Sequence, residues 1–468
     1  MSEQEYTRWM TESLCPTCLT RVPAERVVEG QDVWLVKACP EHGETRTIMW
    51  RGTPDLPGWQ RPKIPSRPPV CYTEPNRGCP YDCGLCTNHG QHTCSALLEI
   101  TQRCNMNCPV CFADSGSVAE PDPTLDAIGK WLASVRHACG DHIVIQLSGG
   151  EPTVREDLPD IIRLARSYGF GFVQINTNGL RLAEDPAYAW QLREAGLSSV
   201  FLQFDGTRDA IYQKLRGRDM MAEKIRAIDH CLQNHLGVVL VPTLVPGINQ
   251  QDIGAILRFG MERAPGIRGV HFQPISYFGR FPDIPDNTQR LTLPEIIRAI
   301  EQQTDRLMKV EHFAPPGCEH SHCSFHGNFV LMENGAVTAM TSKSSSCCNK
   351  PVVAAEGAEK STLFLTRQWA APEGAHAIST PLPTKKPCCE TSQSPSLDEF
   401  LQRIKTHTFA VSGMAFQDVW NVDLERTRNC CIHVVTPEGK LVPFCLYNLT
   451  SASGQTLHRG HVHANLTP

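Results

Sequence analysis

Three closely spaced cysteines, Cys104, Cys108 and Cys111, form the strongest chemical pattern in the chain. They lie in one loop, directly after an apolar run at 97–100 that is typical of a buried strand. Clustered thiolates are the usual ligands of a [4Fe–4S] cluster. The next cysteine, Cys139, comes at the end of an expected helix, so the loop supplies three ligands and leaves one iron open. Catalytic zinc sites differ from structural ones in the same way.

A second pattern, Ser-Gly-Gly-Glu-Pro at 148–152, follows the next apolar run at 142–147. If both runs are neighbouring parallel strands, their carboxyl ends meet at one edge of the sheet, where active sites gather. The sequence therefore predicts that this Gly-Gly-Glu-Pro step faces the cysteine loop and holds a ligand bound to the open iron.

The elements that must position both patterns alternate between strand and helix. Strand-like runs and helical stretches in repeated succession indicate parallel pairing with right-handed crossovers. The predicted fold is α/β, with a partial (β/α)6 TIM-like barrel over 96–290. The expected strands lie at 97–100, 142–147, 171–176, 199–204, 238–244 and 269–274, and the expected helices at 125–135, 157–168, 187–195, 222–235 and 252–261.

Polar residues follow the third and fourth expected strands. Asn176 and Asn178 end the third, and Gln203 and Asp205 end the fourth. At the carboxyl edge of the sheet they would face a bound ligand, and the family resemblance given below implies contact with a cofactor ribose or the substrate. The alternative is plain turn chemistry, because Asn-Gly and Asp-Gly are favoured turn dipeptides.

The remaining cysteine clusters predict further metal centres. Segment 71–95 repeats the triad spacing and adds a fourth thiol, which predicts a fully ligated auxiliary cluster. Residues 1–50 form a small module with four ligands for Zn2+ or a single iron. A proline-rich linker at 51–70 follows it, and a cysteine-rich α+β auxiliary-cluster domain occupies 291–468. The expected ligand sets are Cys79, Cys83, Cys86 and Cys94; Cys15, Cys18, Cys39 and His42; and Cys318, Cys323, Cys348 and Cys445.

Composition narrows the class of protein. The 468 residues include 22 cysteines, 41% are hydrophobic, and the net charge is −5. That charge argues against a nucleic-acid binder. The chain has no apolar run of roughly 18 residues, and its polar N-terminus is unlike a signal peptide. We therefore expect a cytoplasmic protein whose clustered cysteines bind metal rather than form disulfides.

The cysteine triad with the Gly-Gly-Glu-Pro step, in a repeated strand–helix frame, resembles the radical S-adenosylmethionine (SAM) superfamily. The resemblance implies that the triad holds the cluster and that SAM is cleaved reductively to a 5′-deoxyadenosyl radical. It implies that the backbone and glutamate of the step meet the ammonium of SAM, and that glycine is needed because the backbone approaches this ligand closely. The step residues are Gly149, Gly150, Glu151 and Pro152. A flavodoxin- or ferredoxin-type reductant is expected, and no catalytic side chain beyond the cluster ligands.

The full-length layout is similar to the group of archaeal tetraether lipid synthases, also described as 7,8-dihydro-6-hydroxymethylpterin dimethyltransferases. The resemblance implies auxiliary iron centres and radicals formed at unactivated carbons of a small-molecule or lipid substrate. The first expectation is carbon–carbon bond formation of the lipid-chain coupling type. The alternatives are a pterin C-methyltransferase, a radical SAM peptide maturase and a non-enzymatic iron–sulfur electron carrier.

Overall fold

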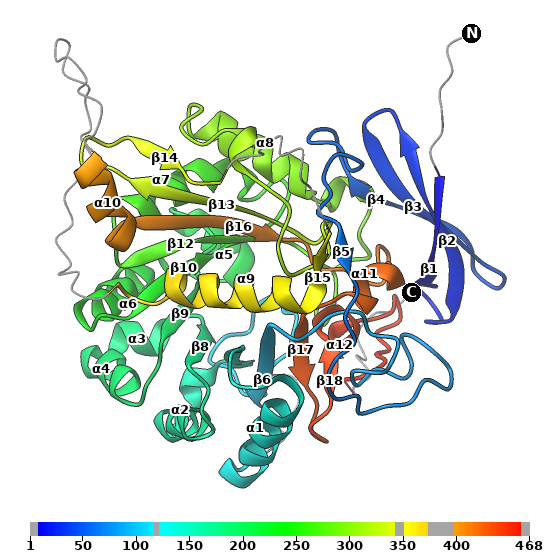
Figure 1. Cartoon of the computed structure of the whole chain (residues 1–468), viewed down its shortest axis with the longest axis horizontal. Coiled ribbons are helices and arrows are strands. Elements are labelled where there is room, and N and C mark those ends of the chain that lie inside the picture. Colours follow the sequence, from blue (N-terminus) through cyan, green and yellow to red (C-terminus); the bar gives the residue numbers. More distant parts are fainter. Residues whose placement is uncertain (1–7, 117–120, 342–350, 373–396, 460–468) are drawn as a thin grey trace.

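The computed structural model describes residues 8–116, 121–341, 351–372 and 397–459. A twelve-stranded sheet forms its centre, and a separate four-stranded sheet lies at one side (Figure 1). Among the described residues, no helix combines the length and the apolar character needed to cross a membrane.

The predicted barrel strands are all present and pair in parallel in chain order. Side chains that alternate along them pack outward against the helices, as Ile145 and Val173 do in the main core. This confirms the predicted fold class. The strands are β6 (Ser95–Thr101), β7 (Val144–Gly149), β8 (Phe172–Thr177), β9 (Ser199–Gln203), β10 (Gly237–Val241) and β12 (Ile267–Pro274), with β11 (Thr243–Leu244) beside β12.

The crossover helices follow ordinary local rules. In α1 (Leu125–Cys139) the Thr124 side chain accepts a backbone N–H of the first turn at 3.2 Å, and Gly140 with φ 75° ends the helix. Ile128, Leu132 and Val135 share one face and are buried against the sheet. The other helices are α2 (Leu158–Ser167), α3 (Leu180–Glu184), α4 (Pro186–Glu194), α5 (Asp209–Arg216), α6 (Met221–Gln233), α7 (Ile253–Met261) and α8 (Leu293–Gln303).

The chain after 290 extends the same sheet at both edges. β16 (Thr408–Met414) pairs in parallel with β12, and β17 (Ile432–Val435) pairs in parallel with β6. β13 (Ser324–Leu331) and β14 (Val337–Ala339) form one antiparallel margin, and β18 (Leu441–Pro443) forms the other. The predicted boundary at 290 therefore does not separate two sheets. Short helices accompany these strands: α10 (Leu397–Thr406), α11 (Leu424–Arg428) and α12 (Phe444–Asn448).

Helix α9 (Ala354–Trp369) crosses the sheet on the side seen in Figure 1. Its last residue, Trp369, packs against Phe201, with ring centroids 5.2 Å apart. A Cβ atom on Gly237, the first residue of β10, would lie 2.3 Å from the Trp369 carbonyl oxygen. The end of α9 thus closes the barrel interior at the amino ends of the strands.

The predicted linker is packed rather than an exposed spacer. Trp59 is fully buried in the main core, 6.2 Å from Trp50 between ring centroids. Farther along, β5 (Lys63–Ile64) pairs in parallel with β15 (Val352–Val353), just before α9. The linker therefore joins the N-terminal module to the region around α9.

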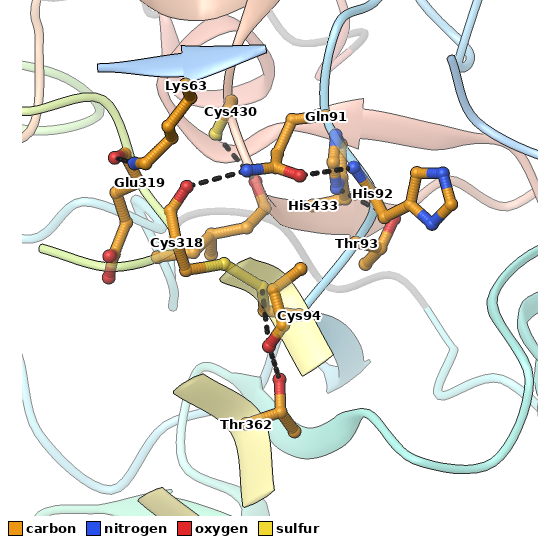
Figure 2. The surroundings of a disulfide bond; sticks show 12 residues. Lys63, Gln91, His92, Thr93, Cys94, Cys318, Glu319, Thr362, Cys430 and His433 are labelled. Carbon is orange, nitrogen blue, oxygen red and sulfur yellow. Dashed lines mark hydrogen bonds between the residues drawn. A yellow bond between two sulfur atoms is a disulfide. The ribbon is translucent and has the colours of Figure 1, made fainter. Parts of the chain in front are cut away.

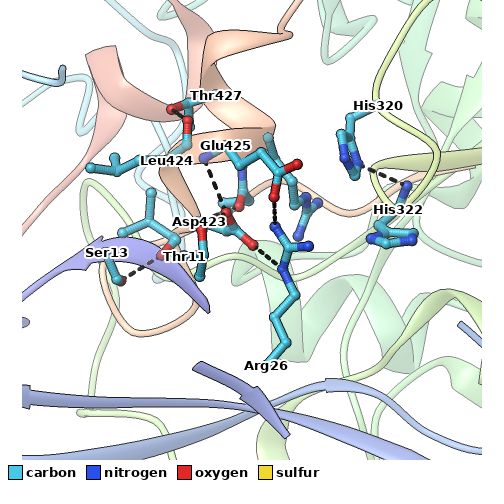
Figure 3. A network of polar contacts seen from close by, with 12 residues as sticks. Thr11, Ser13, Arg26, His320, His322, Asp423, Leu424, Glu425 and Thr427 are labelled. Carbon is cyan, nitrogen blue, oxygen red and sulfur yellow. Dashed lines mark hydrogen bonds and ion pairs between the residues drawn. The ribbon is translucent and has the colours of Figure 1, made fainter. Parts of the chain in front are cut away.

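The N-terminal module is an antiparallel sheet that docks on α11. Arg26 Nε lies 2.7 Å from an Asp423 carboxylate oxygen, and the same guanidinium pairs with Glu425 (Figure 3). Thr11 donates a hydrogen bond to Asp423 at 2.8 Å. Because Asp423 is fully buried, loss of Arg26 would leave an uncompensated charge between the module and α11. Its strands are β1 (Arg8–Leu14), β2 (Arg21–Glu29), β3 (Asp32–Cys39) and β4 (Gly43–Trp50).

Candidate active site and metal centres

The Gly-Gly-Glu-Pro step lies directly against the cysteine loop. Gly150 donates its backbone N–H to the Thr101 carbonyl at 2.8 Å, and Glu151 donates to the Arg103 carbonyl at 2.9 Å. A Cβ atom on Gly149 would lie 2.2 Å from the Thr101 oxygen, and one on Gly150 would lie 2.2 Å from the Arg103 oxygen. Glycine is thus required here by the backbone of the cysteine loop, a reason that differs from the expected close approach of a ligand.

Glu151 links the ends of two strands. Its side chain is 1% exposed. One carboxylate oxygen accepts hydrogen bonds from the hydroxyls of Thr153 at 2.7 Å and Thr177 at 2.6 Å, and the other accepts the backbone N–H of Asn178 at 2.7 Å. Since Glu151 also lines the cavity, a carboxylate of defined orientation faces any ligand bound beside the cysteine loop.

The three loop cysteines fit a multi-iron cluster better than a single ion. Cys104, Cys108 and Cys111 all line the cavity. Their sulfurs are not within 4.8 Å of one another, whereas those of the N-terminal metal group are. Burial, with a smaller contribution from the negative charge of Glu151, raises the pKa of Cys104 to about 11. A bound cation would reverse this shift, because metal ligation holds cysteine as thiolate.

One cavity of about 750 Å³ begins at this loop and runs through the barrel interior. Its polar lining near the loop includes Ser148, Asn176 and Gln203, from β7, β8 and β9. The Asn176 side-chain oxygen is buried and has no partner among the described residues. That atom is therefore available to a ligand.

The other predicted polar residues have different positions. Asn178 also lines the cavity, but its amide donates to the Asn105 side chain at 2.7 Å and so supports the cysteine loop. Gln203 accepts a hydrogen bond from Lys224 at 2.8 Å. Asp205 is fully buried and is not among the cavity-lining residues.

Asp205 instead holds Arg216, which does line the cavity. Burial lowers the pKa of neighbouring Lys224 to about 7, an effect that the charge of Asp205 opposes. Arg216 and Lys224 come from α5 and α6, and no motif marks them in the sequence. The sequence shows only that Arg216 comes at the end of one crossover helix and Lys224 near the start of the next.

A second thiol group borders the same cavity. Cys94 and Cys318 are joined by a disulfide (Figure 2). The Cys431 sulfur lies within 4.8 Å of both of their sulfurs. All three line the cavity, and Gln91 donates to the Cys318 carbonyl at 2.7 Å. The expected sets are corrected here, because Cys94 does not complete the segment 71–95 site and Cys318 does not join Cys323. In reduced form the group offers three thiolates, which suit an iron–sulfur cluster.

The remaining members of the expected C-terminal set lie apart from Cys318. Arg426 donates to the Cys323 sulfur at 3.3 Å. Burial raises the pKa of Cys430, and charge on Cys445 and Cys323 raises it further, so these three lie near one another. Cys348 lies outside the described residues.

In segment 71–95, Cys79 and Cys83 interact with each other. A hydrogen bond with Cys83 lowers the pKa of Cys79 to about 7. Burial raises the pKa of Cys71, and charge on Cys86 raises it further, so Cys71 lies near Cys86.

The N-terminal ligands come together as predicted. Cys15, Cys18, Cys39 and His42 place their ligand atoms within 4.8 Å of one another. A hydrogen bond from His42 lowers the pKa of Cys39 to about 6. Three sulfurs and one imidazole nitrogen fit a tetrahedral zinc or single-iron site.

Two family models match the chain. The model of the radical SAM superfamily matches residues 98–260, and that of the HMPTM N-terminal zinc ribbon domain matches residues 9–51. Both matches coincide with regions described above: the first covers the barrel strands up to α7, and the second covers the four-ligand module.

Individual proteins extend the likeness. A 7,8-dihydro-6-hydroxymethylpterin dimethyltransferase of Methanocaldococcus jannaschii is 34% identical over 97% of this chain and 94% of its own. A GTP 3′,8-cyclase of Nautilia profundicola is 29% identical over 37% of this chain and 55% of its own. The solved structure of Streptococcus suis SuiB with precursor peptide SuiA covers 47% of both chains, with 13% identity and a TM-score of 0.39.

Proposed function

This chain belongs to the radical SAM superfamily, in the family of the 7,8-dihydro-6-hydroxymethylpterin dimethyltransferase, and on that premise we propose that it C-methylates a reduced pterin. It is an enzyme, which excludes the alternative of a non-enzymatic iron–sulfur electron carrier. Its cofactors are [4Fe–4S] clusters and SAM, with zinc or iron in the ribbon. The observation that carries the proposal is the identity to the methyltransferase along nearly the whole chain.

The residues around the cysteine loop have defined tasks in this proposal. When bound, the cluster on Cys104, Cys108 and Cys111 supplies the electron that breaks a carbon–sulfur bond of SAM. Glu151 and Asn176 would orient SAM from β7 and β8, since both line the cavity beside the loop. The same cavity extends into the barrel and offers room for a second molecule within reach of SAM.

The second thiol group supports a reaction with more than one metal centre. Cys94, Cys318 and Cys431 line the cavity together with the loop cysteines. We place an auxiliary cluster there, next to the substrate, where it would bind the substrate or exchange electrons with it. Lys63 and Glu319 border this place, and Lys63 donates to the Glu319 carbonyl oxygen.

A lipid-chain coupling reaction is the second candidate. Part of the cavity wall is apolar: Phe364 and Leu365 of α9 line it, as do Phe416 and Phe444. Such a wall suits an alkyl chain as well as the face of a ring.

The deciding experiment is anaerobic reconstitution, reduction with dithionite, and incubation with SAM and each substrate separately. With 6-hydroxymethyl-7,8-dihydropterin we expect 5′-deoxyadenosine and a pterin heavier by one or two methylene units. The SAM that is cleaved keeps its methyl group on methionine, so the added carbon comes from a separate one-carbon donor supplied in the assay, either a second SAM or a methylene-bearing tetrahydropterin. A coupled lipid in place of a methylated pterin would transfer the proposal to the second candidate. Absence of 5′-deoxyadenosine from an enzyme with intact, reducible clusters would refute both.

A further inference from the structure

A row of polar side chains crosses the inner wall of the barrel. Ser412 on β16 pairs in register with His326 on β13 and with His271 on β12. Side chains that are paired across neighbouring strands project from the same face of a sheet. All three residues line the cavity, so they form one row that faces its interior.

The row has unused hydrogen-bonding capacity. Ser412 Oγ lies 2.8 Å from Nδ1 of His271. Within the part of the chain that the structure describes, no partner is found for Nε2 of His271 or for the His326 ring. Burial lowers the pKa of both histidines to about 4, so both rings are neutral near pH 7. A neutral imidazole offers one donor and one acceptor, and the Ser412 hydroxyl can serve either tautomer.

Flat surfaces adjoin the row. The Phe201 ring centroid lies 5.4 Å from that of His271, and the Trp369 centroid lies 6.3 Å from that of His271. The amide nitrogen of Gln146, which also lines the cavity, donates to Gln174 at 2.8 Å, and this leaves the Gln146 oxygen without a side-chain partner among the described residues. Rings and amides therefore surround a space in which polar atoms lack partners.

An alkyl chain would leave those polar atoms unpaired, which is costly in a buried site. A planar ring that carries N–H and C=O groups on its edge would satisfy them and stack on the aromatic faces. Sites built to hydrogen-bond a ligand discriminate strongly against analogues that lack the matching groups. The row is therefore suited to select one class of substrate.

We propose that the His326–Ser412–His271 row, with Phe201 and Trp369, binds the edge and face of an uncharged, planar nitrogen heterocycle. The inference rests on the proposed function in placing the substrate in this cavity. It goes further by assigning the residues that recognise the ring and by excluding a purely aliphatic occupant at this level of the barrel.

The test measures binding and SAM cleavage separately on reconstituted enzyme under anaerobic conditions. Equilibrium dialysis gives the Kd of 6-hydroxymethyl-7,8-dihydropterin and of guanine for the wild type and for His271→Phe, Ser412→Ala and His326→Phe. His407→Phe is the matched control, because His407 also pairs with a hydroxyl, that of Thr406 at 2.8 Å, but does not line the cavity. Production of 5′-deoxyadenosine without substrate reports on the loop site alone.

Each lost hydrogen bond should weaken heterocycle binding roughly five- to tenfold. Substrate-free cleavage of SAM should stay within about twofold of wild type, since none of the changes touches the cysteine loop. His407→Phe should alter neither quantity. Equal Kd values for all variants, or no binding of either heterocycle by the wild type, would overturn the inference.

The two proposals fail in different ways. If a heterocycle binds in a His271-dependent manner but no methylated pterin forms, the recognition site stands and the proposed reaction falls. If methylated pterin forms and His271→Phe leaves its KM unchanged, the reaction stands and the recognition site falls.

Discussion

Arg216 and Asp205 form a two-pronged ion pair at the wall of the active-site cavity. Arg216 Nε lies 2.7 Å from one oxygen of Asp205, and Nη2 lies 2.9 Å from the other. The Asp205 side chain is 0% exposed and that of Arg216 is 11% exposed. Both oxygens of the buried carboxylate are therefore paired with the guanidinium. The pair is neutral overall, and the guanidinium is the partner that lines the cavity.

Arg216 also interacts with Cys108 of the cysteine loop, so Arg216→Lys should raise the KM for SAM in substrate-free cleavage by about tenfold. Lysine keeps the positive charge but lacks the planar guanidinium that pairs with both carboxylate oxygens of Asp205. Steady-state production of 5′-deoxyadenosine at varied SAM measures this effect. Arg218→Lys is the control, because Arg218 pairs with Glu223 at the surface. An equal change in both variants would show that Arg216 has no special role.

Gly150→Ala should abolish cluster insertion and SAM cleavage. Its Cβ atom would lie 2.2 Å from the Arg103 carbonyl oxygen, so the cysteine loop would have to move. Gly171→Ala is the matched control, since a Cβ atom there meets nothing within 4 Å. Iron content and 5′-deoxyadenosine yield are the measurements. Normal iron content in Gly150→Ala would contradict the steric argument.

Replacing Cys431 with alanine should separate radical formation from product formation. Cys431 belongs to the thiol group away from the loop, so SAM cleavage should continue while methylated product falls at least tenfold. Cys139→Ala, which changes a thiol outside both groups, should leave both activities intact.

The segment 71–95 cysteines provide a related comparison. Alanine at Cys79, Cys83 and Cys86 should leave some SAM cleavage, whereas alanine at Cys104, Cys108 and Cys111 should leave none. Iron analysis checks that each triple change removes one cluster only. Equal loss of cleavage from the two triple variants would mean that the open and closed sites are assigned the wrong way round.

Acid should destabilise the fold partly through His271. The pKa of His271 is about 4 in the folded chain, below its ordinary value of 6.5. Between pH 4 and pH 6.5, His271 is therefore protonated in the unfolded chain but neutral in the folded chain. The contribution of neutral His271 to the free energy of unfolding is therefore fully present above pH 6.5. It is lost as the pH falls toward 4, which lowers the free energy of unfolding by about 3 kcal/mol. Urea unfolding at pH 7.5 and pH 5 should show a smaller loss for His271→Phe than for the wild type. Identical losses would contradict this assignment.

The sequence alone predicts the centre of the candidate site, because the residues that form it lie close together in the chain. The cysteine triad lies within eight residues, and the glycine step follows the very next strand, so spacing alone predicts their meeting. The alternation of strand and helix likewise predicts the barrel, because each crossover returns the chain to the same edge of the sheet.

Tertiary structure decided the partners that lie far apart in the chain. Cys94 and Cys318 are 224 residues apart, and no spacing rule could join them. The sequence predicts that Asp205 contacts a ligand, whereas in the fold α5 places Arg216 against its carboxylate. The His326–Ser412–His271 row exists only because β16 enters the sheet between β13 and β12. Long-range pairing depends on how the sheet edges are filled, and that is a property of the packed fold, not of any single segment.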